Sequence, residues 1–224
     1  MTHIPVMLEE AIDVLIHRSE GVYVDCTFGR GGHAAAILKR LSVNGRLIVM
    51  DKDPEAINCA LMRFKSEPRV TVVHGSFASI KAHLLDADIR QVDGIFLDLG
   101  VSSDQLDTAE RGFSFMRSGP LDMRMDNSQG QSAAEWLRIA DESEIARVLK
   151  DYGEERYAKR IARALVATRD VEPLETTQAL ANLIERVSPS RDHHKHPATR
   201  AFQAIRIQVN RELEDLDRCL TEVP

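Results

Sequence analysis

The 224-residue sequence has few cysteines and no long apolar run. Its three cysteines, Cys26, Cys59 and Cys219, are odd in number and widely spaced, which argues against a disulfide framework and a clustered zinc site. Such cysteines are typical of small buried residues in a reducing compartment. No stretch approaches the ~18 consecutive apolar residues of a membrane span, and the N-terminal stretch has acids where a signal peptide needs bases. We therefore expect a cytoplasmic protein with no membrane partner.

The sequence also has no overall excess of positive charge. With 35 acidic and 29 basic residues, the net charge of −6 argues against a uniformly basic nucleic-acid binder. The charge is unevenly distributed, however: residues 1–146 carry 15 bases and 22 acids, whereas residues 147–211 carry 13 bases and 8 acids. A basic segment in an acidic protein indicates one region that meets phosphate. The length predicts one domain with an insertion, or two small domains.

The first hundred residues alternate between apolar strand-like runs and helical stretches. Strands are predicted at residues 21–27, 46–50, 70–74 and 92–99, and the Asp53-Pro54 pair predicts a helix start. Strands that are apolar on both faces and separated by helices are typical of a parallel sheet covered on both sides. The pattern therefore predicts an α/β protein with a doubly wound, mainly parallel sheet.

The alternation ends after Gly100. Residues 101–131 are predicted to form an ordered loop region, followed by helical stretches at 133–167 and 176–187. Apolar residues at steps of three and four then predict one final helix over 202–220. We place the core domain at 1–103 and 199–224, and an inserted loop-plus-helical subdomain at 104–198.

A glycine-rich turn follows the first predicted strand, in the run from Asp25 to His33 (DCTFGRGGH). Glycines allow a close approach to a ligand, and Asp51 at the end of the second strand suits a ribose, so an adenosine-like cofactor is predicted. The spacing Gly29-x-Gly31-x-x-Ala34 also fits a dinucleotide fingerprint, which leaves an NAD-dependent oxidoreductase as an alternative. The carboxylate of Asp25 favours the cationic S-adenosylmethionine over an anionic pyrophosphate.

Asp98 closes the fourth predicted strand, in the run DLGVSS, and is expected to face the same crevice. An exocyclic ring amine is a poor nucleophile because its lone pair is delocalised into the ring. A carboxylate that accepts a hydrogen bond from the amine can hold it in a reactive geometry. Asp98 is thus the candidate catalytic residue, and the alternative is a strand-end cap.

Aromatic and arginine side chains alternate in the loop region beyond Asp98. Arg111, Phe113, Phe115 and Arg124 are candidate substrate residues, because rings can stack on a flipped base while arginine contacts phosphate. The alternative is that the aromatics anchor the loop. The cluster at residues 193–196 (HHKH) has no distant partner ligand, so no metal site is predicted.

Several blocks in this order and spacing resemble one family. They are His3-x-Pro5-Val6, DxTxGxGGH at 25–33, DLGVSSxQLD at 98–107, RGFSF at 111–115, GPLDMRMD at 119–126, YGEER at 152–156 and FQAIRIxVNxEL at 202–213. The family is that of the bacterial 16S rRNA cytosine-N4 methyltransferases (MraW type), and the resemblance covers nearly the whole chain. It implies a class I methyltransferase fold, which is Rossmann-like, with an inserted all-helical substrate-recognition subdomain.

The resemblance also implies the chemistry. S-adenosyl-L-methionine would be the methyl donor for the N4 amine of a cytidine, in an rRNA base methylation that belongs to rRNA processing. The implied partners are 16S rRNA and the small ribosomal subunit, with RNA binding by the inserted helices, and a homodimer stays open. Cofactor contacts fall by motif on Gly31, Gly32, His33, Asp51, Phe77, Asp98 and Gln105.

The sequence departs from the family pattern at its C-terminal end. The family continues with further sheet strands and an S-F-H-S-L-E-D block that has no match here, so we expect a sheet without its last strands and a shortened enzyme. Two alternatives to a methyltransferase stay open: the NAD-dependent oxidoreductase, and a non-catalytic RNA-binding assembly factor that keeps the cofactor fold.

Overall fold

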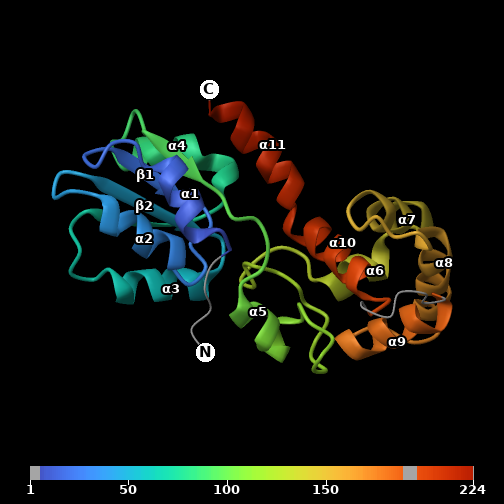
Figure 1. Ribbon diagram of the computed structural model, residues 1–224. Helices are drawn as coiled ribbons and strands as arrows, with labels where there is room; N and C mark the ends of the chain where they lie inside the picture. Colours follow the sequence, from blue (N-terminus) through green and yellow to red (C-terminus); the bar gives the residue numbers. More distant parts are fainter. Residues whose placement is uncertain (1–5, 189–195, 224) are drawn as a thin grey trace. The chain divides into compact units, whose positions relative to one another are not determined.

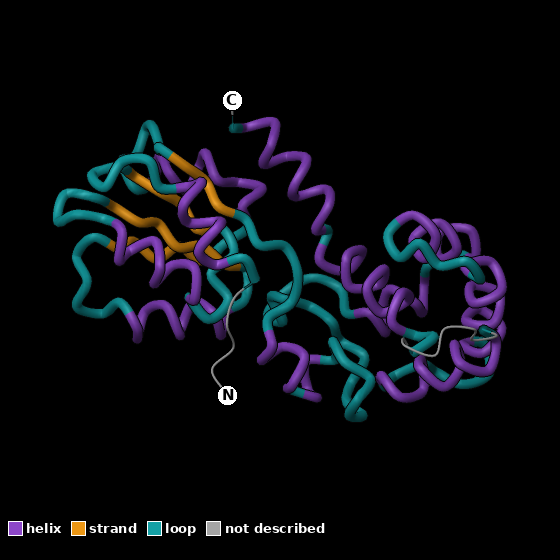
Figure 2. The backbone as a smooth tube through the Cα atoms, in the orientation of Figure 1, coloured by secondary structure: helices purple, strands orange, loops and turns teal. Residues whose placement is uncertain are grey.

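The computed structural model describes residues 6–188 and 196–223, and the chain divides into two compact units. The first unit comprises Met1–Ser102 and Leu213–Pro224, and the second comprises Ser103–Glu212. The helices and strands are numbered in chain order; Figure 1 labels those for which there is room, and Figure 2 colours them by type. His3 and Pro5 of the first motif, and residues 193–195 of the histidine cluster, lie outside the described residues.

The first unit contains a four-stranded parallel sheet in the order β3-β2-β1-β4. Its strands are β1 (Val22–Asp25), β2 (Arg46–Asp51), β3 (Val70–His74) and β4 (Gly94–Phe96). The sheet is drawn in orange in Figure 2. All four predicted strands are present, although β4 is much shorter than the predicted span of 92–99. The predicted α/β fold class is therefore confirmed, with four strands in the described part of the chain.

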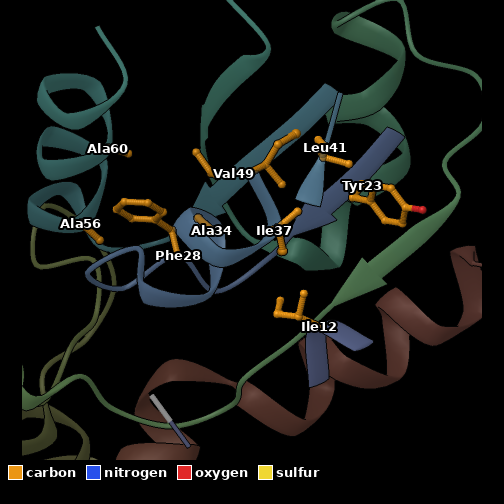
Figure 3. Close-up of a cluster of buried hydrophobic side chains, with 10 residues drawn as sticks. Ile12, Tyr23, Phe28, Ala34, Ile37, Leu41, Val49, Ala56 and Ala60 are labelled. Atoms are coloured by element: carbon orange, nitrogen blue, oxygen red, sulfur yellow. The ribbon is translucent and has the colours of Figure 1, made fainter. Parts of the chain in front are cut away.

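Helices cover both faces of this sheet. Figure 3 shows the cluster on one face, where Tyr23 and Val49 meet Ile12 of α1 (Leu8–Leu15), Ile37 of α2 (Gly32–Arg40) and Ala60 of α3 (Pro54–Arg63). The opposite cluster joins Val24, Ile48 and Met50 to η1 (Phe77–Ser79), α4 (Ile80–Asp86) and α11 (Glu212–Glu222). Neighbouring residues such as Tyr23 and Val24 point to opposite faces, as strand geometry requires.

The start of α3 agrees with the prediction. Asp53 is the N-cap, its carboxylate accepts the backbone N–H of Glu55 at 2.9 Å, and Pro54 occupies the first helical position. A cap of this kind satisfies one of the N–H groups that the first helical turn leaves without an intrahelical partner. It also fixes where the chain leaves β2, directly after Asp51.

The second unit is helical. It contains α5 (Ser103–Asp107), η2 (Ala109–Arg111), α6 (Ala133–Ile139), α7 (Glu142–Asp151), α8 (Ala158–Arg169), α9 (Thr177–Val187) and α10 (Thr199–Asn210). The predicted helical stretch at 133–167 is three helices, since Asp141 caps a new helix start at α7 and α8 begins only at Ala158. The apolar residue Ile139 is 66% exposed, since α6 ends there and the helical phase begins again at α7.

The prediction of one final helix over 202–220 is wrong. The chain forms two helices, α10 and α11, which are separated by Arg211 in the left-handed conformation (φ 54°). Asn210 holds the end of α10 within the second unit, since its side-chain amide donates to the Met123 carbonyl at 2.7 Å and accepts the Met125 N–H at 2.7 Å. Because α10 packs on α6 and α7, the second unit extends to Glu212 and not to the expected boundary at 198.

Candidate cofactor-binding and catalytic site

Three carboxylates lie at the carboxyl edge of the sheet. Asp25 ends β1, Asp51 ends β2, and Asp98 follows β4 by two residues. Because these strands are parallel and adjacent, their carboxyl ends meet at one edge. The structure thus brings together the three acidic residues that the sequence pointed to.

Asp51 is fixed by two backbone hydrogen bonds. Its Oδ2 accepts the N–H of Gly29 at 2.8 Å, and its Oδ1 accepts the N–H of Asp53 at 2.9 Å. Burial raises the pKa of Asp51 above the usual aspartate value, while these backbone donors lower it. Asp51 therefore orders the glycine turn and the start of α3 at the same time.

The glycine turn adopts a backbone that favours glycine. Gly29 and Gly31 have positive φ angles of 53° and 74°. A Cβ on Gly31 would lie 2.5 Å from the ring of Phe28, whereas no described atom lies within 4 Å of a Cβ on Gly29. Gly32 and His33 then begin α2. The turn is therefore tightly packed at Gly31 and open at Gly29, which suits a loop that a ligand approaches closely.

Asp25 is fully buried beside this turn. Its Oδ1 accepts the N–H of Thr27 at 3.1 Å, and its Oδ2 finds no hydrogen-bond partner among the described residues. Burial raises the pKa of Asp25 to about 7, an effect that the charges of Asp51 and Asp98 increase and the Thr27 amide opposes. A cation brought to this edge of the sheet would stabilise the ionised form of Asp25.

His33 lies between Asp98 and the N-terminal segment. Its ring packs on Phe96 at a centroid distance of 4.5 Å, and its Nε2 lies 3.3 Å from the Val6 carbonyl oxygen. Its Nδ1 lies 3.8 Å from Asp98 Oδ2. The Asp98 N–H donates to Thr27 Oγ1 at 2.7 Å, while the Asp98 side chain is 54% exposed. Asp98 thus has an anchored backbone and an accessible carboxylate, as a group that meets a substrate needs.

Phe77 lies at the start of η1, after β3. Ser76 caps this short helix, because its hydroxyl accepts the Ala78 N–H at 3.1 Å. The Phe77 side chain is 7% exposed and belongs to the apolar cluster with Met50 and Cys219. The expected contact with the adenine of a cofactor stays a prediction.

The remaining candidate residues belong to the second unit. Gln105 lies on α5 and is buried, and its expected cofactor contact also stays a prediction. Arg111 is buried, lies 5.7 Å from the centre of the Phe113 ring, and donates to the carbonyls of Arg124 and Met125. These contacts are typical of residues that anchor a loop.

Phe115 and Arg124 also have partners within the second unit. The Phe115 ring packs against His196 and Phe202, with centroid distances of 4.5 and 4.8 Å. The Arg124 guanidinium forms a bidentate pair with Asp122, with distances of 2.9 and 2.6 Å. Since the Asp122 carboxylate occupies part of this guanidinium, a contact of Arg124 with RNA phosphate stays a prediction.

Sequence reasoning missed Lys52, Ser76 and Asp215. Asp215 is 7% exposed and binds the side chains of both other residues. The available signal was its position on α11, where Asp215 falls four residues before the buried Cys219 and therefore on the same helix face. An acidic residue on the inward face of a helix indicates a buried partner.

The described residues contain no group of three or more His, Cys, Asp or Glu side chains arranged to hold a metal ion. Within the same residues, no helix is long and apolar enough to cross a membrane.

Two comparisons relate this chain to known proteins. A crystal structure described as a "putative rRNA-methylase from Clostridium thermocellum" matches 36% of this chain at 22% identity, with a TM-score of 0.30. The matched part spans 48% of that protein. The model of the MraW methylase family matches residues 1–224. This chain therefore belongs to the MraW methylase family.

Proposed function

We propose that this protein transfers a methyl group from S-adenosylmethionine to the N4 amine of a cytidine in 16S rRNA. Membership in a methylase family supports the reaction class. The observation that carries the choice of cofactor is the buried Asp25 carboxyl, whose Oδ2 has no hydrogen-bond partner among the described residues. This oxygen, which can accept a hydrogen bond, lies next to a glycine turn and two further carboxylates. Such an arrangement fits a cationic ligand that bears N–H groups.

The residues at the sheet edge fit this cofactor. Asp51 would hold the ribose, and Phe77 would lie against the adenine. The turn residues Gly31, Gly32 and His33 would contact the rest of the cofactor. Asp98 and Gln105 would be further contacts. The cofactor supplies an electrophilic methyl group on a sulfonium: the N–C bond would form as the S–C bond breaks, and S-adenosylhomocysteine would leave. Negative charge on Asp25, beside the glycine turn, would repel the pyrophosphate of NAD, so this carboxylate opposes the oxidoreductase alternative.

Asp98 is the proposed catalytic residue. An N4 amine has a delocalised lone pair, and a hydrogen bond from the amine to the Asp98 carboxylate would orient that lone pair toward the methyl carbon. The amine proton becomes acidic once the new N–C bond forms, so a weak base such as Asp98 can accept it. The hydrogen bond from the Asp98 N–H to Thr27 Oγ1 supports the required positional precision.

The substrate assignment depends on the second unit. Its helices α7 and α8 carry exposed basic side chains, which are Arg147, Lys150, Lys159, Arg160 and Arg163. Exposed bases of this density suit RNA phosphates. Action on 16S rRNA or the small ribosomal subunit during rRNA processing, a cytoplasmic location and a homodimer belong to the same proposal.

A transfer assay tests the proposal. The chain is incubated with labelled S-adenosylmethionine and either naked 16S rRNA or small subunits from a strain that lacks the modification. Label on a cytidine N4, mapped by mass spectrometry, is the expected result. Binding of S-adenosylhomocysteine without transfer to either substrate would contradict catalysis and favour a non-catalytic RNA-binding assembly factor. A thermal shift with NADH but not with S-adenosylhomocysteine would contradict the cofactor.

A further inference from the structure

We propose that Asp215 on α11 is a positioning residue for the cofactor. It joins the loop after β2, which directly follows Asp51, to the loop after β3, which directly precedes Phe77. This inference rests on the proposed function, because it assigns to Asp215 the task of holding two expected cofactor contacts in place.

The contacts of Asp215 are made by one buried carboxylate. Asp215 Oδ2 accepts a hydrogen bond from the Ser76 hydroxyl at 2.7 Å and forms an ion pair with Lys52 Nζ. The Asp215 side chain is 11% exposed and that of Lys52 is 22% exposed. Solvent screens a pair this enclosed much less than it screens a surface ion pair.

The two partners flank the expected cofactor contacts directly. Lys52 follows Asp51 in the chain, and Ser76 precedes Phe77. Ser76 also caps η1 through the same hydroxyl that donates to Asp215. A shift of Lys52 or Ser76 therefore moves the backbone of the neighbouring cofactor residue.

Backbone contacts show that the two loops already lie side by side. The Gly75 N–H donates to the Asp51 carbonyl at 2.9 Å, and His74 Nε2 lies 3.0 Å from the Lys52 carbonyl oxygen. Asp215 adds a side-chain link between loops in contact. A link of this kind restricts the relative motion of Asp51 and Phe77, which lowers the ordering cost of ligand binding.

Helix α11 is held on the first unit by other contacts as well. Cys219 is buried in the apolar cluster with Ile48 and Phe77, and Glu222 Oε2 accepts the Lys81 N–H at 3.2 Å. Loss of the Asp215 carboxylate therefore leaves the helix its apolar anchor. The role of Asp215 is thus separable from the docking of α11.

The test is calorimetric binding of S-adenosylhomocysteine to the whole chain. Asp215→Ala is expected to raise the dissociation constant about tenfold, the size of one lost charge-assisted hydrogen bond. Asp215→Asn, which keeps an acceptor for Ser76, is expected to have a smaller effect. Asp217→Ala, an exposed position on the same helix, is the matched control and should leave binding unchanged.

Two further measurements separate positioning from general destabilisation. The loss should be equal for 5′-methylthioadenosine, since this ligand keeps the ribose and adenine that Asp51 and Phe77 are expected to contact. Lys52→Met and Asp215→Ala should also be non-additive in the double variant, because they break one link. Unchanged binding by Asp215→Ala, or additive effects, would overturn the inference.

If Asp215→Ala does not fold, Ser76→Ala serves in its place. Its affinity for S-adenosylhomocysteine is expected to fall about threefold, and an unchanged dissociation constant would be the contrary result. Failure of the wild-type chain to bind would contradict the proposed function itself.

Discussion

The Oδ2 atom of Asp51 accepts the backbone N–H of Gly29 at 2.8 Å, so the carboxylate at the end of β2 fixes the turn after β1. This hydrogen bond crosses between the two central strands at the edge where the cofactor is proposed to bind. It gives Asp51 two tasks, to order the turn and to accept the ribose hydroxyls. The two tasks can be separated by substitution.

Asp51→Ala should raise the dissociation constant of S-adenosylhomocysteine by about 10- to 100-fold, because hydrogen bonds to a charged acceptor are lost. Asp51→Asn keeps an acceptor for Gly29 and should lose less. Calorimetry measures both, and Asp86→Ala, an exposed position on α4, is the control. An unchanged constant in Asp51→Ala would refute the ribose contact.

The raised pKa of Asp25 predicts a pH dependence of stability. Its pKa is about 7 in the folded chain and 3.8 as the reference, so the folded state holds an extra proton between these values. The contribution of Asp25 to the free energy of unfolding is therefore greatest below pH 4. It falls by on the order of 4 kcal/mol as the pH rises toward 7. Asp25→Asn should remove this fall. Its melting temperature should exceed that of the wild type at pH 8 and approach it at pH 4, and a constant difference would contradict the assignment.

The same group predicts a pH dependence of cofactor binding. A cationic ligand favours the Asp25 carboxylate, so binding of S-adenosylmethionine must expel the proton below pH 7. Affinity should rise about tenfold between pH 6 and pH 8, following the ionised fraction of a group with a pKa near 7. Calorimetry in buffers of different ionisation enthalpy measures the proton release. Asp25→Asn should bind with a flat profile, and a steep profile in that variant would assign the proton elsewhere.

The sheet and the acidic residues at its edge could be predicted from the sequence because their signals are local. Apolar runs such as 46–50 mark strands, and Asp53-Pro54 marks a helix start, independently of any distant contact. Asp25 and Asp51 followed because Asp25 lies near the carboxyl end of the first predicted strand and Asp51 directly follows the second. The burial of Asp25 was not predictable, since it depends on packing around the turn from several segments of the chain.

The end of the chain could not be predicted from periodicity alone. The apolar spacing from 202 to 220 continues across Arg211, although the backbone turns there into the left-handed region. The break is stabilised by Asn210, whose partners Met123 and Met125 lie 85 or more residues away in the chain. For the same reason Lys52 and Ser76 carried no signal, because the partner of both is Asp215.

Substitution of Asp98 tests the catalytic assignment apart from binding. Asp98→Ala should lower the rate of methyl transfer by at least about 100-fold, the usual contribution of a positioned acid or base. Cofactor binding should stay measurable by calorimetry. Asp107→Ala, exposed on α5, is the control. Transfer retained by the Asp98 variant would show that this carboxylate does not hold the amine.

Gly31 tests how tightly the turn is packed. Gly31→Ala carries both the cost of a side chain at φ 74° and the contact of its Cβ with the Phe28 ring at 2.5 Å. Gly29→Ala in the same turn carries only the first cost, because no described atom lies within 4 Å of its Cβ. We expect a loss of about 1 kcal/mol in the free energy of unfolding for Gly29→Ala. For Gly31→Ala the loss should be about 2–4 kcal/mol, since overpacking adds to the strain. Urea denaturation followed by circular dichroism measures both. Equal losses would mean that Phe28 yields, and that the turn is shaped by its backbone angles alone.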